Sequence, residues 1–242
     1  MEVIKMLFSN SSFYCVVAEE DGRLVGSNCL DERSSVAGLG PISVDPPVQS
    51  RGIGRALMTA LLERVRERGF AGVRLLQAPF NLRSLSLYAK LGFDVREPIA
   101  VMSGRTAART IPECSVRPAA AEDEPACSSL CEQVHGFART GELRDAIAQG
   151  SARVVARDGR LTGYACGFGY FGHAVAETTH DLKALIASAE EVGGPGILVP
   201  LRNAELFRWC LENGLRVFQP MTLMTIGMYN EPRGAYLPSV LY

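Results

Sequence analysis

The sequence of 242 residues has no excess of charge of either sign and no long hydrophobic run. Its 25 basic and 26 acidic residues give a net charge of −1, which argues against nucleic acid as a partner. No stretch approaches the roughly 20 apolar residues of a membrane-spanning helix, and the apolar part of the opening MEVIKMLFSN is too short for a signal peptide. These absences predict a soluble cytoplasmic protein with no membrane partner.

The sequence also lacks paired cysteines and clustered histidines. Its seven cysteines are an odd number without CxxC spacing, so we expect reduced thiols. Cys127 and Cys131 are four residues apart and could share a helix face as metal ligands, but no second pair lies near them, which favours core packing and no metal. His135, His173 and His180 lie in no recognisable motif, and we expect them to be structural or exposed.

The first hundred residues alternate β-rich runs and amphipathic helices. Runs at 13–19 and 24–30 flank Asp21-Gly22, a pair typical of a tight hairpin because both turn positions need positive φ. A third run covers 36–44. The pattern predicts an α+β fold with a mixed sheet. The further expected elements are a helix from Ile53 to Gly69, a strand at 73–78, a helix at 81–91 and two short strands at 93–102 around Pro98.

Part of this pattern recurs later in the chain. DGRLVG at 21–26 returns as DGRLTG at 158–163. The spacing between Asn81 and Gly92 returns between Asn203 and Gly214. We infer an internal duplication.

The duplication divides the chain into two domains. Residues 105–113 have no apolar periodicity and resemble a linker, which separates a first domain at 1–104 from a second at 114–242. In the second domain we expect an opening strand and a helix that starts near Glu124, and a strand-to-helix passage at 173–192 without phosphate-binding glycines.

A bend at residues 44–57, VDPPVQSRGIGRAL, leads from a strand into a helix. Backbone N–H groups at such a helix start lack partners and are backed by the helix dipole, so they can bind an anion such as phosphate. Gly52 and Gly54 let an anion approach the backbone, while the side chains of Gln49, Arg51 and Arg55 add donors or charge.

Of two other interpretations of this bend, one stays open and the other is excluded. The glycines could serve turn geometry alone. A Rossmann dinucleotide site is excluded, because Leu57 replaces the third glycine of GxGxxG and the preceding strands form hairpins rather than a βαβ unit.

Two segments together resemble the GCN5-related N-acetyltransferase (GNAT) superfamily. QSRGIG at 49–54 is similar to its Q/R-x-x-G-x-G/A signature, and NLRSLSLYAKLGF at 81–93 is similar to its N-x-x-A-x-x-L-Y-x-K-x-G-F, with Ser84 at the alanine place. The resemblance covers residues 13–102 well and the second domain only as a weakened repeat.

The resemblance implies acetyl-coenzyme A (acetyl-CoA) as co-substrate. Ile42 and Val44 would pair with pantetheine, and the Ile42 amide would polarise the thioester carbonyl. Tyr88 would protonate the departing thiolate, although an aromatic at this helical spacing is also a common core residue. The implied cofactor-binding residues are Ile42, Val44, Gln49, Arg51, Gly52, Ile53, Gly54, Arg55, Asn81, Ser84 and Tyr88.

The sequence departs from the family pattern in both domains. The first lacks its opening strand, with MEVIKMLF as a remnant of the second helix, so a sheet edge needs covering by the second domain, by another subunit of a homodimer, or by the tail from Tyr229 to Tyr242. The second lacks the pyrophosphate loop and has Cys210 at the place of Tyr88, so we expect it to bind no coenzyme A and to shape the acceptor pocket.

The sequence therefore predicts direct acetyl transfer from acetyl-CoA to a primary amine of a small molecule or peptide. The alternative is a catalytically silent acyl-CoA-binding or interaction module. No general base is nominated, because the acidic residues near the expected strands could equally be solvated turn charges. These acids are Glu19, Glu20, Asp31, Glu32 and Asp45.

Overall fold

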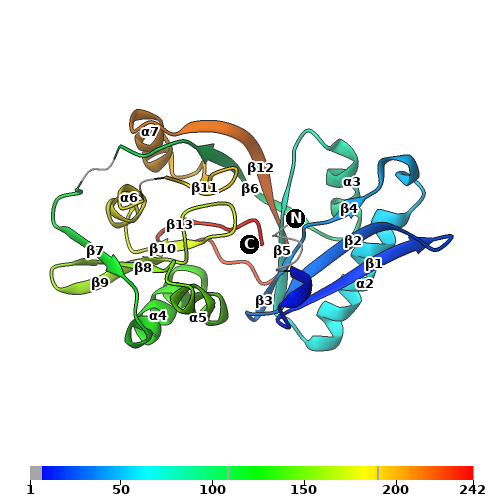
Figure 1. The fold of residues 1–242 in the computed structure, drawn as a ribbon, viewed down its shortest axis with the longest axis horizontal. Helices are drawn as coiled ribbons and strands as arrows, with labels where there is room; N and C mark the ends of the chain where they lie inside the picture. The colour runs from blue at the N-terminus through cyan, green and yellow to red at the C-terminus, as the bar shows by residue number, and fades with distance from the viewer. Residues whose placement is uncertain (1–6, 108–109, 190, 242) are drawn as a thin grey trace.

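The computed structural model describes residues 7–107, 110–189 and 191–241, and it has two lobes (Figure 1). The lobe on the right of the view contains the first half of the chain, and the lobe on the left contains most of the second half. Strands β6 and β12 run between the lobes at the top of the view. The architecture is a mixed α+β fold with two sheets.

In the first half, a hairpin leads into strands and helices of one mixed sheet. Helix α2 packs on this sheet through buried residues that recur at helical spacing, such as Leu57, Leu61 and Val65. Its elements are β1 (Phe13–Glu20), β2 (Arg23–Asp31), β3 (Val36–Leu39), β4 (Ser43–Val44), α2 (Ile53–Arg68), β5 (Gly72–Gln77), α3 (Leu82–Lys90) and β6 (Asp94–Ser103), with a short 3-10 helix η1 (Pro46–Val48) before α2.

The second half follows the same order of elements and starts with a strand and two helices. These are β7 (Cys114–Pro118), α4 (Glu124–His135), after the 3-10 helix η2 (Ala121–Asp123), and α5 (Thr140–Ala148). The rest are β8 (Arg153–Arg157), β9 (Arg160–Ala165), β10 (Ala174–Ala176), α6 (Thr179–Ala187), β11 (Ile197–Pro200), α7 (Ala204–Glu212), β12 (Arg216–Gly227) and β13 (Ala235–Leu237).

The two halves exchange strands. In the first sheet the order is β1-β2-β3-β5-β12-β6-β11, so β12 of the second half lies between β5 and β6 of the first. Strand β6 of the first half in turn separates β11 from β12, and all of these pairings are antiparallel. The sequence division at 105–113 is therefore not a division between sheets, although the described residues of that segment form neither helix nor strand.

The landmarks of the sequence repeat occupy equivalent places. Asp21 and Gly22 have φ of 52° and 74° in the turn between β1 and β2, and Asp158 and Gly159 have 53° and 73° between β8 and β9. Each hairpin also has an irregularity in register before its turn. The side chains of Asn81 and Asn203 cap α3 and α7, and Gly92 and Gly214 follow those helices with φ of 98° and 94°.

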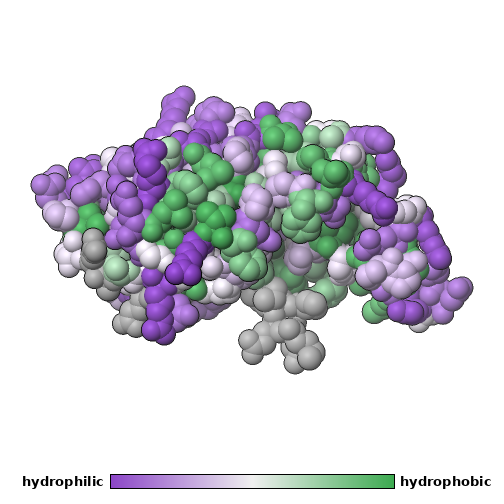
Figure 2. All heavy atoms as spheres, turned by 90° about the horizontal axis from the view of Figure 1, so that it is seen from above, coloured by the Kyte–Doolittle hydropathy of each residue, from purple (hydrophilic) through white to green (hydrophobic). Residues whose placement is uncertain are grey.

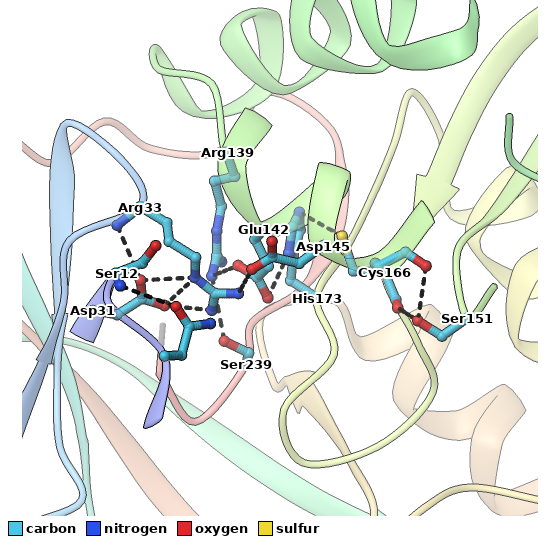
Figure 3. Close-up of polar contacts among 12 residues, drawn as sticks. Ser12, Asp31, Arg33, Arg139, Glu142, Asp145, Ser151, Cys166, His173 and Ser239 are labelled. Carbon is cyan, nitrogen blue, oxygen red and sulfur yellow. Dashed lines mark hydrogen bonds and ion pairs between the residues drawn. The ribbon is translucent and has the colours of Figure 1, made fainter. Parts of the chain in front are cut away.

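A partly buried ionic network joins the halves (Figure 3). Arg33 of the first half donates to both Asp31 oxygens and, at 2.9 Å, to Asp145 on α5. Deeper in the second half, Arg139 binds Glu142, and Nδ1 of His173 lies 3.1 Å from Glu142 Oε1. This pairing satisfies charges that would otherwise be costly to bury.

The C-terminal residues dock on the first half. The Val240 N–H donates to the Tyr170 carbonyl at 2.8 Å, and Leu241 is buried with Leu7, Phe13 and Cys29. Strand β1 remains at the edge of the first sheet. The tail therefore covers a face of that sheet rather than its edge, and most of the predicted remnant helix MEVIKMLF lies outside the described residues.

Apolar side chains also gather on the outside of the molecule. Figure 2 looks onto the side where α7 and β12 lie and shows apolar residues on the left of that face. Leu211 of α7 is 44% exposed, and Val217 and Phe218 of β12 are 47% and 62% exposed. No helix among the described residues is long and apolar enough to cross a bilayer.

Three sequence expectations are corrected. Cys15 and Cys29, opposite each other on β1 and β2, form a disulfide, so the prediction of reduced thiols is wrong for this pair. The expected strand at 36–44 is broken at Gly40-Pro41 into β3 and β4, because proline has no N–H to donate to a sheet. Residues 94–103 form one strand, β6, since Pro98 sits within it without interrupting its pairing.

Candidate functional site

A cleft opens in the first half where neighbouring strands separate. Strand β3 pairs in parallel with the start of β5, but β4 pairs with β2 and leaves the end of β5. The cavity between them is about 370 Å³. It is lined by Ile42, Val44, Gln49, Ser50, Gly52, Gly54, Arg55, Asn81, Arg83, Ser84, Leu87 and Tyr88.

The N-terminus of α2 faces this cleft with free donors. Gly52 caps the helix at φ 91°, in the left-handed region that favours glycine. In the described part of the chain, no hydrogen bond is recorded from the N–H groups of residues 51–55. A Cβ on Gly54 would lie 3.8 Å from Val44 and from Leu87, both on the cleft wall, so glycine keeps this space open. Consecutive free amides of this kind can bind a phosphate.

The charges around the cleft have one sign. Arg55 and Arg83 are among its lining residues, and no carboxylate is. Both arginines lie in the first turns of α2 and α3, where neither helix has an acidic residue and where a cation opposes the helix dipole. The site is therefore electrostatically suited to an anionic ligand.

Tyr88 lies on the inner wall of the cleft, on α3. Its side chain is 6% exposed and its ring centroid lies 6.0 Å from that of Phe93. Burial raises the pKa of the Tyr88 hydroxyl, so the group is protonated at neutral pH. Within the described residues no hydrogen bond is recorded for this hydroxyl. Tyr88 can therefore act as a proton donor to a bound group.

On the strand side of the cleft, the main-chain groups of Val44 and Ile42 differ in their hydrogen bonding. The Val44 carbonyl, expected to pair with a ligand, accepts a hydrogen bond from Gln49 Nε2 at 3.1 Å. The Ile42 N–H has no recorded partner among the residues that the structure describes. Ile42 thus offers the main-chain N–H that was expected to polarise the thioester carbonyl. The Gln49 side chain, expected to bind the cofactor, instead donates to the Val44 carbonyl.

Asn81 and Ser84 are tied into the start of α3. Asn81 Oδ1 accepts from the Ser84 N–H at 3.1 Å, which makes it the helix cap. Ser84 Oγ donates to the Asn81 carbonyl and accepts from Gln77 Nε2 at 3.1 Å. Both residues therefore shape the cleft wall.

The cleft includes nine of the eleven residues that the sequence nominated for cofactor binding. Arg51 and Ile53 are the two outside its lining, and Arg51 pairs with Glu20 at 3.3 Å. Ser50, Arg83 and Leu87 were missed. An arginine in the first turn of a helix, against the dipole, was a sequence signal that could have found Arg83.

The equivalent place in the second half is closed. At the start of α6, the Thr178 hydroxyl accepts from the Asp181 N–H, and the buried Asp181 carboxylate binds Arg157 at 3.0 Å. A protein carboxylate thus supplies the negative charge at this helix start. Strand β13 pairs with β10 and contacts β11, so it lies where the first half has its opening.

One buried group has the composition of a metal site. Glu142, Cys166 and His173 place one potential ligand atom each within 4.8 Å. However, His173 Nδ1 faces Glu142 and its Nε2 bonds Tyr164 at 2.9 Å, while the guanidinium of Arg139 binds Glu142. Because Glu142 and Cys166 approach different nitrogens of one ring beside a cation, we assign no metal to this group.

Sequence comparison assigns the first part of the chain to a family. Residues 2–93 match the Acetyltransferase (GNAT) family. The chain is 41% identical over 63 residues to mycothiol acetyltransferase of Nocardia farcinica, which covers 26% of this chain and 21% of that one. It is 40% identical over 65 residues to the ribosomal protein bS18-alanine N-acetyltransferase of Escherichia coli, covering 27% and 41%. The chain thus spans less than half the length of these relatives.

Structural comparison extends the likeness to the whole fold. The crystal structure of a candidate acetyltransferase from Pyrococcus horikoshii superposes with a TM-score of 0.72, covering 100% of this chain and 80% of that one. The two sequences are 18% identical, so this similarity concerns the fold alone.

Proposed function

We propose that this protein is an N-acetyltransferase that transfers an acetyl group from acetyl-CoA to a primary amine. The main support is the row of unpartnered N–H groups at 51–55, which suits the pyrophosphate of coenzyme A. Arg55 and the open space at Gly54 fit the same group. The backbone of 51–55 would hold the pyrophosphate, and Ile42, Val44, Asn81 and Ser84 would line the pantetheine arm.

The reaction follows from two groups of the cleft. Bound acetyl-CoA supplies an activated thioester whose C–S bond breaks as the amine forms a C–N bond with the carbonyl carbon. The Ile42 N–H would stabilise the negative charge that develops on the carbonyl oxygen. The Tyr88 hydroxyl, kept protonated by burial, would give its proton to the sulfur.

The acceptor is an amine of a small molecule or a peptide. The amine must lose a proton to react, and no carboxylate lines the cleft to accept it. We therefore infer that the amine arrives neutral or loses its proton to water. The relatives described above are named as a mycothiol acetyltransferase and as an N-acetyltransferase of alanine in ribosomal protein bS18. These names support an amine acceptor in general.

The second half, in this proposal, is a diverged copy of the first. The matching turns and helix caps support duplication, with domains at 1–104 and 114–242 joined by 105–113. Its closed helix start and inserted β13 support the expectation that it binds no coenzyme A. We also propose a cytoplasmic location. We further propose a homodimer, in which the second subunit covers β1, the edge strand of the first sheet.

Calorimetric titration with acetyl-CoA tests the cofactor assignment. We expect binding by the unmodified chain and a loss of about 10-fold or more in affinity in Gly54→Leu, whose side chain would fill the cleft. Ala56→Leu, on the exposed side of the same helix, is the matched control and should bind normally. Absence of binding by the unmodified chain would contradict the proposal.

The lack of a carboxylate in the cleft favours a second candidate, a silent acyl-CoA-binding module. The two functions differ in product formation. Release of free thiol from acetyl-CoA on addition of an amine from a broad panel supports the enzyme, whereas binding without turnover by any amine supports the module.

A further inference from the structure

Strand β1 lies at the edge of the first sheet, and its outer side pairs with no strand among the described residues (Figure 1). Its sequence is FYCVVAEE, and the first six of these residues include no charge and no proline. The other described edge strands are shorter. Strand β11 has four residues and β13 has three, while β7 has five that include Arg117 and Pro118. Charged residues and prolines protect edge strands from pairing with other chains, and most of β1 lacks this protection.

The hydrogen bonds of the β1–β2 hairpin show which main-chain groups of β1 face outward. The Glu32 N–H donates to the Ser12 carbonyl at 2.9 Å, so Ser12 and every second residue after it bond to β2. Cys15 lies between those positions, and its Cα is 4.1 Å from that of Cys29, the short spacing of a pair without hydrogen bonds. The N–H and carbonyl groups of Cys15 and Val17 therefore point away from β2. In the described part of the chain, no partner is recorded for them.

The side chains along this edge are mostly apolar and partly exposed. Tyr14 is 39% exposed and Val17 is 51% exposed. Leu24, on the neighbouring strand β2, is 64% exposed. A further strand added beside β1 would bond the outward main-chain groups and cover part of this apolar surface.

The charges of β1 favour a second copy of the same strand in the antiparallel direction. Glu19 and Glu20 lie together at the end of β1, so parallel copies in register would place like charges side by side. An antiparallel copy instead places the two glutamates beside the uncharged start of the other strand, near Ser12 and Phe13. The strand is therefore complementary to itself in one direction only.

We propose that two copies of this chain dimerise by antiparallel pairing of their β1 strands, with Val16 at the two-fold axis. In this register Cys15 of each copy lies opposite Val17 of the other, and each such pair exchanges two hydrogen bonds. The two eight-stranded sheets thereby join into one continuous sheet. The inference rests on the homodimer of the proposed function and identifies its interface.

Sedimentation velocity over a range of chain concentrations tests the proposal. We expect the unmodified chain to form a dimer. Val17→Pro removes an outward N–H, and proline is tolerated on an edge strand, so this variant should fold and should dimerise about 30-fold or more weakly. Val17→Thr keeps the N–H and is the matched control, which should dimerise normally.

A charge on the edge gives a second test that leaves the main chain intact. Val17→Lys places a lysine from each copy close to the interface and should also weaken the dimer. Leu24→Lys adds the same charge at an exposed position of β2, which is not an edge strand, and should leave the dimer unchanged.

The register is tested by cross-linking Val16→Cys. In the proposed pair the two substituted side chains lie opposite each other without hydrogen bonds between their main chains, as Cys15 and Cys29 do within the hairpin. Mild oxidation with copper phenanthroline should join them into a covalent dimer on a non-reducing gel. Ala18→Cys, which would lie opposite Tyr14, should cross-link much less.

A chain that stays monomeric at every concentration would overturn the homodimer and this interface together. A dimer that persists in Val17→Pro and in Val17→Lys would overturn the interface alone. Calorimetry with acetyl-CoA on the same samples tests the acetyltransferase proposal separately, because the outer edge of β1 is not part of the cleft lining. Circular dichroism establishes that each variant is folded.

Discussion

The carbonyl oxygen of Leu241 lies against Gly38, so close that a Cβ at residue 38 would come within 1.6 Å of it. The glycine is required for this contact rather than for its own backbone angles, since its φ is not in the left-handed region. The end of the second half is thereby seated directly on β3 of the first.

Replacement Gly38→Ala should destabilise the fold by about 1–3 kcal/mol, because the tail or the strand must move to make room. The measurement is the free energy of unfolding in urea. Gly167→Ala is the matched control, since a Cβ there meets nothing within 4 Å, and it should have little effect. A Gly38→Ala variant as stable as the control would show that the tail is not packed on β3.

Replacement Tyr88→Phe should lower turnover by about 100-fold or more, because the departing sulfur loses its proton donor. The affinity for acetyl-CoA should change little, since the ring still packs on Phe93. Steady-state kinetics and calorimetry measure the two quantities separately. Tyr14→Phe, on the exposed strand β1, serves as control, and full activity in Tyr88→Phe would remove this residue from the mechanism.

The buried histidines should make the protein sensitive to mild acid. Burial, with the nearby Arg74 and Arg139, lowers the pKa of His135 well below 6.5, so it stays neutral in the fold but gains a proton when unfolded. Stability is then lost as the pH falls below about 6.5. Each such histidine costs about 1.4 kcal/mol between pH 7.5 and 5.5.

Unfolding free energies at those two pH values check this expectation. In His135→Phe the difference between pH 7.5 and 5.5 should shrink by the contribution of one histidine, and any constant cost of the larger ring cancels. Phe93→Leu, a buried change that removes no titratable group, should leave the difference unchanged. An equal pH dependence in both variants would contradict a neutral buried His135.

Below pH 4.5 a further loss is expected from Glu142. Its burial alone would raise the carboxyl pKa, but Arg139 and the neighbouring His173 lower it to about 2. This carboxylate therefore stabilises the fold fully above its unfolded pKa of 4.5 and loses that effect as the pH falls towards 2. Glu142→Gln should flatten the stability curve in that range, as measured by thermal unfolding at fixed salt.

The disulfide between Cys15 and Cys29 should be detectable by counting thiols. Under denaturing conditions without reductant, the chain should expose five reactive thiols out of seven cysteines. Reduction should lower the free energy of unfolding by about 2–3 kcal/mol. The double variant Cys15→Ala/Cys29→Ala should show no such response, and seven thiols before reduction would refute the bond.

Local features of the sequence predicted local features of the fold. The Asp21-Gly22 turn, the helix after Gly52 and the helix after Asn81 follow from neighbouring residues, and so does most of the cleft lining. The exchange of β6 and β12 was not predictable, because strand pairing between distant segments leaves no pattern at the level of residue spacing. Cys15 and Cys29 were missed for a local reason: a regular hairpin around Asp21-Gly22 would place Asn28 opposite Cys15, and the register shift between Ala18 and Glu19 places Cys29 there instead.

The interleaved strands have a consequence for the chain as a whole. A protease that cut the segment at 105–113 would not release two particles, because each fragment has a strand seated inside the sheet of the other. The fragments should remain one noncovalent complex until denatured. Either fragment produced alone would have a gap between its strands and should aggregate until its counterpart is supplied.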